Sequence, residues 1–118
     1  MPGYVDGFVI PVPEDRLDDY LAQARLAGEV WKDHGALAYV ECVADDVGDG
    51  GDVHASFRNA AQARDDETVI FSWIVYESRE ARDRIAKAAM EDPRLEGQEM
   101  IFDVKRMAYG GFEPRVEL

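Results

Sequence analysis

Cysteine is almost absent from this sequence: Cys42 is the only one among 118 residues, so no internal disulfide can form. Long apolar runs are absent too, since none approaches the roughly 20 residues that span a membrane. The first segment, MPGYVDGFVIPVPED, has no basic cluster of the kind that opens a signal peptide. These absences predict a protein of the reducing cytoplasm without a membrane partner.

Basic residues are scarce: 13 lysines and arginines stand against 25 aspartates and glutamates, a formal net charge of −12 at pH 7. Such a field repels phosphate backbones, so we expect no nucleic-acid partner. The sequence also lacks a glycine-rich phosphate loop, a G-x-S-x-G elbow and zinc-ligand spacing. The acidic stretch with Asp45, Asp46, Asp49 and Asp52 lacks the alternating ligands and the closing glutamate of an EF-hand. We therefore expect no metal and no cofactor, and interpret the stretch as a solvated loop.

What the sequence does contain is a single domain, residues 1–118, with enough apolar residues (47%) to bury a core. β-Prone runs and helical spacing predict six elements in the order β-α-β-β-α-β. Strands are expected over residues 4–10, 37–44, 68–76 and 101–109. The helices run from Glu14 to a glycine cap at Gly35, and from a Ser78 cap to Asp92. Residues 45–67 form the least regular region. This order is that of an α+β, ferredoxin-like fold, an antiparallel four-stranded sheet with two helices on one face.

The strand expected at 68–76, TVIFSWIVY, is apolar on both of its faces, because both alternating sets of side chains are rich in aliphatic and aromatic residues. Two short helices cover one face of a sheet, so the other face needs a second partner. An identical sheet related by a two-fold axis is the simplest partner, and it gives a barrel-like dimer core with helices outside. The sequence therefore predicts a homodimer, in which Ile74 is a candidate interface residue.

The sequence resembles the bacterial domain-of-unknown-function family 1428 in five stretches that together span nearly the whole chain: YVDGFVIPVP, WKDHGALAYVECVADDV, DETVIFSWIVYESR, MEDPR and FDVKRMAYGGFEP. Members of that family are placed in the dimeric α/β-barrel superfamily, so the resemblance implies the fold and the dimer expected above. The family has no settled activity, so the resemblance implies no particular reaction. Where members usually show a Thr-Ser-Phe-Pro-like stretch, this chain has Ala55, Ser56, Phe57 and Arg58.

Three ionisable residues, Asp6, Glu41 and Arg106, fall in the middle of predicted strands. A charge inside a sheet covered on both faces must be paired or hydrogen-bonded. One interpretation is a small cavity in which a carboxylate acts as a base and Arg106 holds an anion, with Tyr39 beside Glu41 as a ligand-binding residue. The other is an ion-pair network that fixes the strand register or the dimer. In either case we expect Arg106 to be more buried than Lys105 and to contact Asp6 or Glu41.

Two other residues are candidates with plainer alternatives. His34 is a candidate general base, but its position before Gly35 also suits the C-terminal cap of a helix. Trp73, like Trp31, is a candidate for an aromatic pocket, although tryptophan at such positions is more often part of a core.

Two functions of different classes remain open. The first is a small-molecule site in each protomer, with cofactor-independent monooxygenase-like or isomerase-like chemistry as its enzymatic form, by analogy of fold alone. The second is a non-catalytic, stress-related or structural dimer. A cavity lined by Asp6, Glu41 or Arg106 together with an aromatic residue favours the first function, and solid packing at the same place favours the second.

Overall fold

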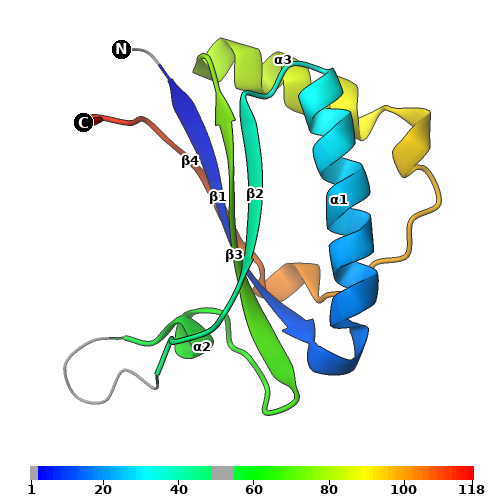
Figure 1. Cartoon of the computed structure of the whole chain (residues 1–118), viewed down its shortest axis with the longest axis vertical. Helices are drawn as coiled ribbons and strands as arrows, with labels where there is room; N and C mark the ends of the chain where they lie inside the picture. The colour runs from blue at the N-terminus through cyan, green and yellow to red at the C-terminus, as the bar shows by residue number, and fades with distance from the viewer. Residues whose placement is uncertain (1–2, 49–54) are drawn as a thin grey trace.

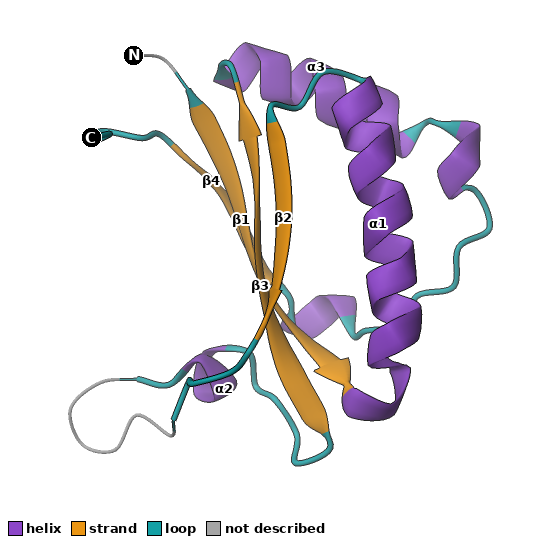
Figure 2. Ribbon diagram, viewed as in Figure 1, coloured by secondary structure: helices purple, strands orange, loops and turns teal. Residues whose placement is uncertain are grey.

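In the computed structural model, which describes residues 3–48 and 55–118, four antiparallel strands form one sheet in the order β2-β3-β1-β4. The strands are β1 (Tyr4–Pro13), β2 (Ala38–Val43), β3 (Glu67–Tyr76) and β4 (Ala108–Phe112). Helices α1 (Leu17–Asp33) and α3 (Arg79–Met90) lie on the same side of this sheet (Figure 1). The architecture confirms the predicted α+β class and is consistent with a ferredoxin-like arrangement (Figure 2).

The core lies between the sheet and the two helices. Alternation along β1 and β3 sends the even-numbered side chains toward the helices, where Tyr4 pairs with Tyr76 and Ile10 with Ile70. Buried residues of α1 and α3 pack against them in two clusters. Ile74 is only 5% exposed and belongs to the first of these clusters. It is therefore a core residue beneath the helices, and its expected place at a sheet–sheet interface is wrong.

The helix ends follow their sequence signals. A 3-10 turn over Glu14–Arg16 leads into α1, which ends at His34, and Gly35 then adopts a φ of +118° that other residues rarely reach. Ser78 caps α3 by accepting a hydrogen bond from the backbone nitrogen of Ala81 at 3.0 Å. Both predicted caps are confirmed. Among the described helices, none is long and apolar enough to cross a membrane.

The first strand is longer than predicted, because β1 continues through Pro11 to Pro13 instead of ending before them. β4 pairs with β1 only over residues 5–9, so one side of β1 is a free edge at both prolines. Proline lacks an N–H donor and is tolerated at such an edge.

The predicted fourth strand at 101–109 is wrong for most of its length. β4 covers Ala108–Phe112, and the residues before it include a 3-10 turn over Val104–Arg106. Asp103 starts this turn by accepting a hydrogen bond from the backbone nitrogen of Lys105 at 3.0 Å. Gly111 lies inside β4 because the ring of Tyr4 occupies the space that a side chain there would need.

The region 45–67 is less irregular than predicted. Its described part contains a short helix, α2 (Phe57–Ala60), which Ser56 caps through a 3.0 Å hydrogen bond from the backbone nitrogen of Asn59. Two residues of the acidic stretch, Asp49 and Asp52, lie outside the described residues. Within residues 3–48 and 55–118, no group of three or more histidine, cysteine or acidic side chains is arranged to hold a metal ion.

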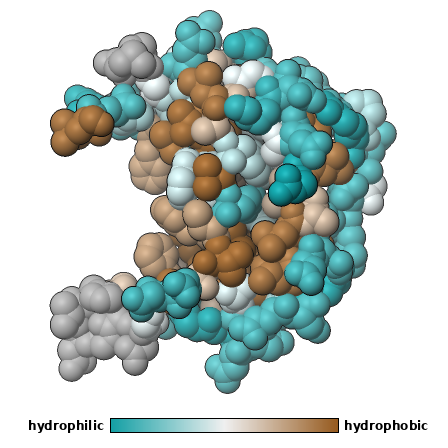
Figure 3. Space-filling view, viewed as in Figure 1, coloured by the Kyte–Doolittle hydropathy of each residue, from teal (hydrophilic) through white to brown (hydrophobic). Residues whose placement is uncertain are grey.

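The face of the sheet that points away from α1 and α3, called here the open face, is apolar. Across its centre it presents only apolar side chains and glycine: Val5, Gly7, Val9, Ala38, Val40, Cys42, Phe71, Trp73, Val75, Ala108, Gly110 and Phe112. Phe71 is 45% exposed and Phe112 is 63% exposed. Figure 3 shows apolar side chains along a hollow on this side of the molecule. Monomeric proteins seldom expose so continuous an apolar surface.

Candidate functional site

A cavity of about 390 Å³ lies between the helix-covered face of the sheet and helices α1 and α3. Strands β1, β2 and β3 supply its floor, α1 and α3 its walls, and Phe102 and Met107 approach it from the segment before β4. Eight of the residues that line it are aromatic: Phe8, Tyr20, Trp31, Tyr39, Trp73, Tyr76, Phe102 and Tyr109. Ligand sites in proteins have this size and this mostly apolar lining, with a few polar groups that orient the ligand.

Two carboxyl groups, those of Asp6 and Glu41, stand on the floor of the cavity. The strand register places Asp6 in a row with Ile74 and Tyr39, and Glu41 in the next row with Ser72. Strand spacing and rise put the Cα atoms of Asp6 and Glu41 about 12 Å apart. The two carboxyl groups therefore act on different parts of the cavity and do not form a pair that shares one proton.

Glu41 is held by two tyrosines. Tyr20 of α1 donates a hydrogen bond to Oε1 at 2.8 Å, and Tyr39 of β2 donates one to Oε2 at 2.9 Å. Burial raises the pKa of Glu41, and the two hydroxyl donors oppose this rise. Burial also raises the pKa of both tyrosines, so their hydroxyls stay protonated and remain donors. Among the described residues, no cation forms an ion pair with Glu41.

Glu41 also borders the outside of the protein. Glu41, Tyr39 and Ala24 line both the cavity and a groove between α1 and β2. The ring of Tyr39 passes so close to α1 that a Cβ atom at Gly28 would lie 2.8 Å from its Cδ1. Glycine is therefore required at this position, and the close approach holds the Tyr39 hydroxyl at Glu41.

Asp6 is in a different electrostatic environment. It is 2% exposed, and Arg82 of α3 places Nη1 at 2.7 Å from its Oδ1. The Tyr76 hydroxyl also hydrogen-bonds to Asp6 and in turn accepts a hydrogen bond from Trp31 Nε1 at 3.0 Å. Burial raises the pKa of Asp6, whereas Arg82 and Tyr76 oppose the rise. Arg82 thus supplies a counter-charge to Asp6 that Glu41 does not have.

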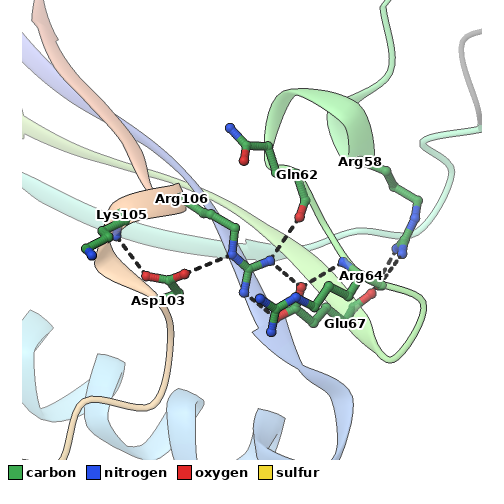
Figure 4. A network of polar contacts seen from close by, with 7 residues as sticks. All are labelled: Arg58, Gln62, Arg64, Glu67, Asp103, Lys105 and Arg106. Carbon is green, nitrogen blue, oxygen red and sulfur yellow. Dashed lines mark hydrogen bonds and ion pairs between the residues drawn. The ribbon is translucent and has the colours of Figure 1, made fainter.

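Arg106 is not part of the cavity, and its predicted contact with Asp6 or Glu41 is wrong. It forms a two-pronged ion pair with Glu67 at the start of β3, at 2.6 and 2.8 Å, and also contacts Asp103 at 3.1 Å (Figure 4). The 3-10 turn directs its guanidinium toward the end of the sheet instead of across it. The prediction that Arg106 is more buried than Lys105 is confirmed, because the Arg106 side chain is only 11% exposed whereas Lys105 is exposed.

The Arg106 ion pair belongs to a structural network. Its hydrogen bonds hold the pKa of Glu67 at about 2, far below the usual value. Glu67 also accepts a hydrogen bond from the backbone nitrogen of Arg64 at 2.7 Å, and Arg58 binds the backbone carbonyls of Arg64 and Glu67 (Figure 4). The network joins the α2–β3 connection and the turn before β4 to the end of β3. The structural interpretation of Arg106 therefore fits its contacts.

The remaining candidates, His34 and Trp73, also lie away from the cavity interior. His34 caps α1 and lies 2.9 Å from Asp92 through Nε2. Trp73 borders the cavity through its strand, but alternation places its ring on the open face beside Phe71, at 5.7 Å between ring centroids.

Three residues of the candidate site were not identified as such from the sequence: Arg82, Tyr20 and Tyr76. Tyr20 and Tyr76 fit the apolar patterns of α1 and β3, so nothing in the sequence indicates that their hydroxyl groups bind Glu41 and Asp6. Arg82 follows the buried Ala81 on α3 and precedes Ile85 by three residues, close to the inner face of the helix. That spacing is the signal that could have suggested its approach to the sheet.

The comparisons place the chain among bacterial proteins without an assigned activity. Residues 3–104 match the model of the family described as "Protein of unknown function (DUF1428)". The uncharacterized protein YbaA of Escherichia coli strain K12 is 48% identical over 116 residues, which cover 97% of each chain. The YbaA proteins of Escherichia coli O157:H7 and Shigella flexneri match with the same identity and coverage. The chain therefore belongs to the DUF1428 family of proteins of unknown function.

Proposed function

We propose that each protomer binds a small, largely apolar organic molecule in the cavity between the sheet and helices α1 and α3. The observation that carries this proposal is the 390 Å³ space itself, lined by aromatic rings and by the carboxyl groups of Asp6 and Glu41. Ligand sites are concave and mostly apolar and carry a few polar groups that orient the ligand, as this space does. The cavity favours a binding function over a purely structural dimer.

Proton transfer on the bound molecule is a second candidate function, and Glu41 supports it. Its carboxyl group lines the cavity, and burial raises its pKa above the usual value, as is common for catalytic acids and bases. This is the isomerase-like or cofactor-independent form of the proposal. Asp6 is better suited to positioning the ligand than to proton transfer, because Arg82 and Tyr76 already bind its carboxyl group.

The proposed functional unit is a homodimer that joins two open faces in the reducing cytoplasm. The centre of the open face is apolar on all four strands, and it exposes Phe71 and Phe112. Phe57 of α2 extends this surface, since its ring meets that of Phe71 edge-on at 5.7 Å. A two-fold axis lets one such surface cover its own copy.

Ligand binding is tested with a neutral aromatic probe, 2-naphthalenemethanol, by isothermal titration calorimetry. We expect one molecule to bind per protomer. Ala27→Leu adds bulk to the cavity wall and should weaken binding roughly tenfold or more. Ala22→Leu makes the same change on the exposed side of α1 and should have no effect. An absence of binding, or equal binding by the Ala27→Leu variant, contradicts the proposed site.

Glu41→Gln should stabilise the protein at neutral pH. Burial raises the pKa of Glu41 in the folded state above its usual value of 4.5. Glu41 therefore contributes its full stability below pH 4.5, and this contribution is lost as the pH rises through the folded-state pKa. Glutamine is neutral at every pH. Its carbonyl oxygen can accept a hydrogen bond from one tyrosine, and its amide nitrogen can donate one to the other. Thermal unfolding should give a higher Tm for the variant at neutral pH, and this advantage should disappear below pH 4.5.

Glu67→Gln is the matched comparison, and it should have the opposite effect. Arg106 lowers the pKa of Glu67 from 4.5 to about 2, so this ion pair stabilises the fold above pH 4.5 and is lost as pH falls toward 2. The variant should lose several degrees of Tm at neutral pH, because Arg106 is left without its charged partner. If both glutamine variants lose stability, Glu41 is a structural residue.

The homodimer is tested by light scattering, which should give about twice the 13.2 kDa mass of one chain. Phe71→Asp places a charge in the centre of the open face and should yield a folded monomer. Leu37→Asp alters an apolar residue that is at least as exposed but lies outside that face, and it should leave the dimer intact. A wild-type protein that is monomeric at micromolar concentration would refute the dimer.

A further inference from the structure

The charges around the cavity do not balance. Asp6 and Glu41 both line it, but no lysine, arginine or histidine is among the described residues that do so. Arg82 reaches Asp6 from α3 and is occupied there. The groove outside Glu41 does not correct the imbalance, because the charged residues of α1 that line it cancel one another: Arg25, Glu29, Lys32 and Asp33. An ionised Glu41 is therefore a negative charge without a cationic partner among the described residues.

Hydrogen bonds from Tyr20 and Tyr39 only partly offset this charge. Each hydroxyl occupies one lone pair of a carboxyl oxygen, and each oxygen keeps a second lone pair that can accept from a ligand. Burying a carboxylate without a cation costs free energy, which a cation brought by a ligand would recover. The missing component at Glu41 is thus a positively charged donor.

The aromatic walls suit the same kind of ligand. The face of an aromatic ring attracts a cation, and indole does so most strongly. Trp31, Tyr20 and Tyr39 all line the cavity, and the two tyrosines contact Glu41 directly. The protein already uses this interaction nearby, since the Arg82 guanidinium lies 4.9 Å from the centre of the Tyr4 ring. A charged head group and an apolar body would therefore both find complementary surfaces.

We propose that the cavity is selective for a hydrophobic amine, whose protonated nitrogen binds the Glu41 carboxylate while its apolar part lies among the aromatic side chains. This inference rests on the proposed binding function and specifies its ligand class. A carboxylate ligand would meet Glu41 with like charge, and Arg82 is engaged by Asp6. A neutral alcohol would donate a hydrogen bond but leave the charge of Glu41 unbalanced. The net charge of −12 further favours cations over anions in the approach to the protein.

Three naphthalene compounds that differ only in their head group test this selectivity: 2-naphthylmethylamine, 2-naphthalenemethanol and 2-naphthoate. Isothermal titration calorimetry at neutral pH should show that the amine binds roughly tenfold or more tightly than the alcohol, as a charge-assisted hydrogen bond predicts. The naphthoate should bind most weakly. Equal affinity for the amine and the alcohol overturns the amine proposal but leaves the cavity as a binding site. If none of the three binds, the proposed function fails, and the amine proposal fails with it.

Variants locate the source of the selectivity. Glu41→Gln should reduce amine binding to the level of the alcohol while alcohol binding itself changes little. Glu29→Gln removes the same charge from the groove side of α1 and should keep the full preference for the amine. An amine preference that survives Glu41→Gln, or that disappears in Glu29→Gln, overturns the assignment to Glu41. The wild-type comparison of the three compounds decides selectivity independently of either variant.

Discussion

The acidic side chains of the sheet, Asp6 and Glu67 buried and Glu41 half-buried, all need partners, and the structure meets this need in three different ways. The sheet is apolar on both faces, so every acidic side chain in it must find a partner inside the fold. Glu67 forms a two-pronged ion pair with an arginine, and Asp6 is bound by an arginine and a tyrosine. Glu41 accepts hydrogen bonds from two tyrosines only. The first arrangement lowers the carboxyl pKa and joins chain segments, whereas burial dominates at the other two. The contrast separates the structural acid Glu67 from Glu41, the acid to which we assign a ligand.

The two faces of the sheet serve different parts of the proposed function, and β3 connects them. Ser72 and Ile74 face the cavity, while Phe71 and Trp73 of the same strand point to the open face. In a dimer joined through the open face, the partner would pack against the side of the sheet opposite the cavity floor. Association of two chains and the shape of the ligand site are therefore expected to be coupled through one strand.

Local signals in the sequence predicted the order of the four strands and two long helices, the Gly35 and Ser78 caps and a second apolar face of the sheet, because each depends on neighbouring residues alone. They did not predict α2, and they did not show that Ile74 faces the helices. The position of Arg106 could not be predicted in this way. Its strand assignment rested on β-prone residues, but the Asp103 cap starts a tight turn that directs the side chain to Glu67, 39 residues away in the chain. Asp6 and Glu41 were grouped in the sequence because both are charges in the middle of predicted strands, and strand pairing places both on the helix-covered face. The contributions of Arg82 and Tyr20 depend on how the helices dock, which no local pattern encodes.

The central claim is that Glu41 is a half-buried acid that lacks a cation within the described fold and receives one from its ligand. Carbon-13 NMR of the Glu41 side-chain carboxyl, followed through a pH titration with and without 2-naphthylmethylamine, measures this most directly. The account predicts a pKa above the usual 4.5 in the free protein, because burial disfavours the charge, and a lower pKa when the amine is bound. A pKa at or below 4.5 in the free protein, or one that the bound amine leaves unchanged, would contradict it.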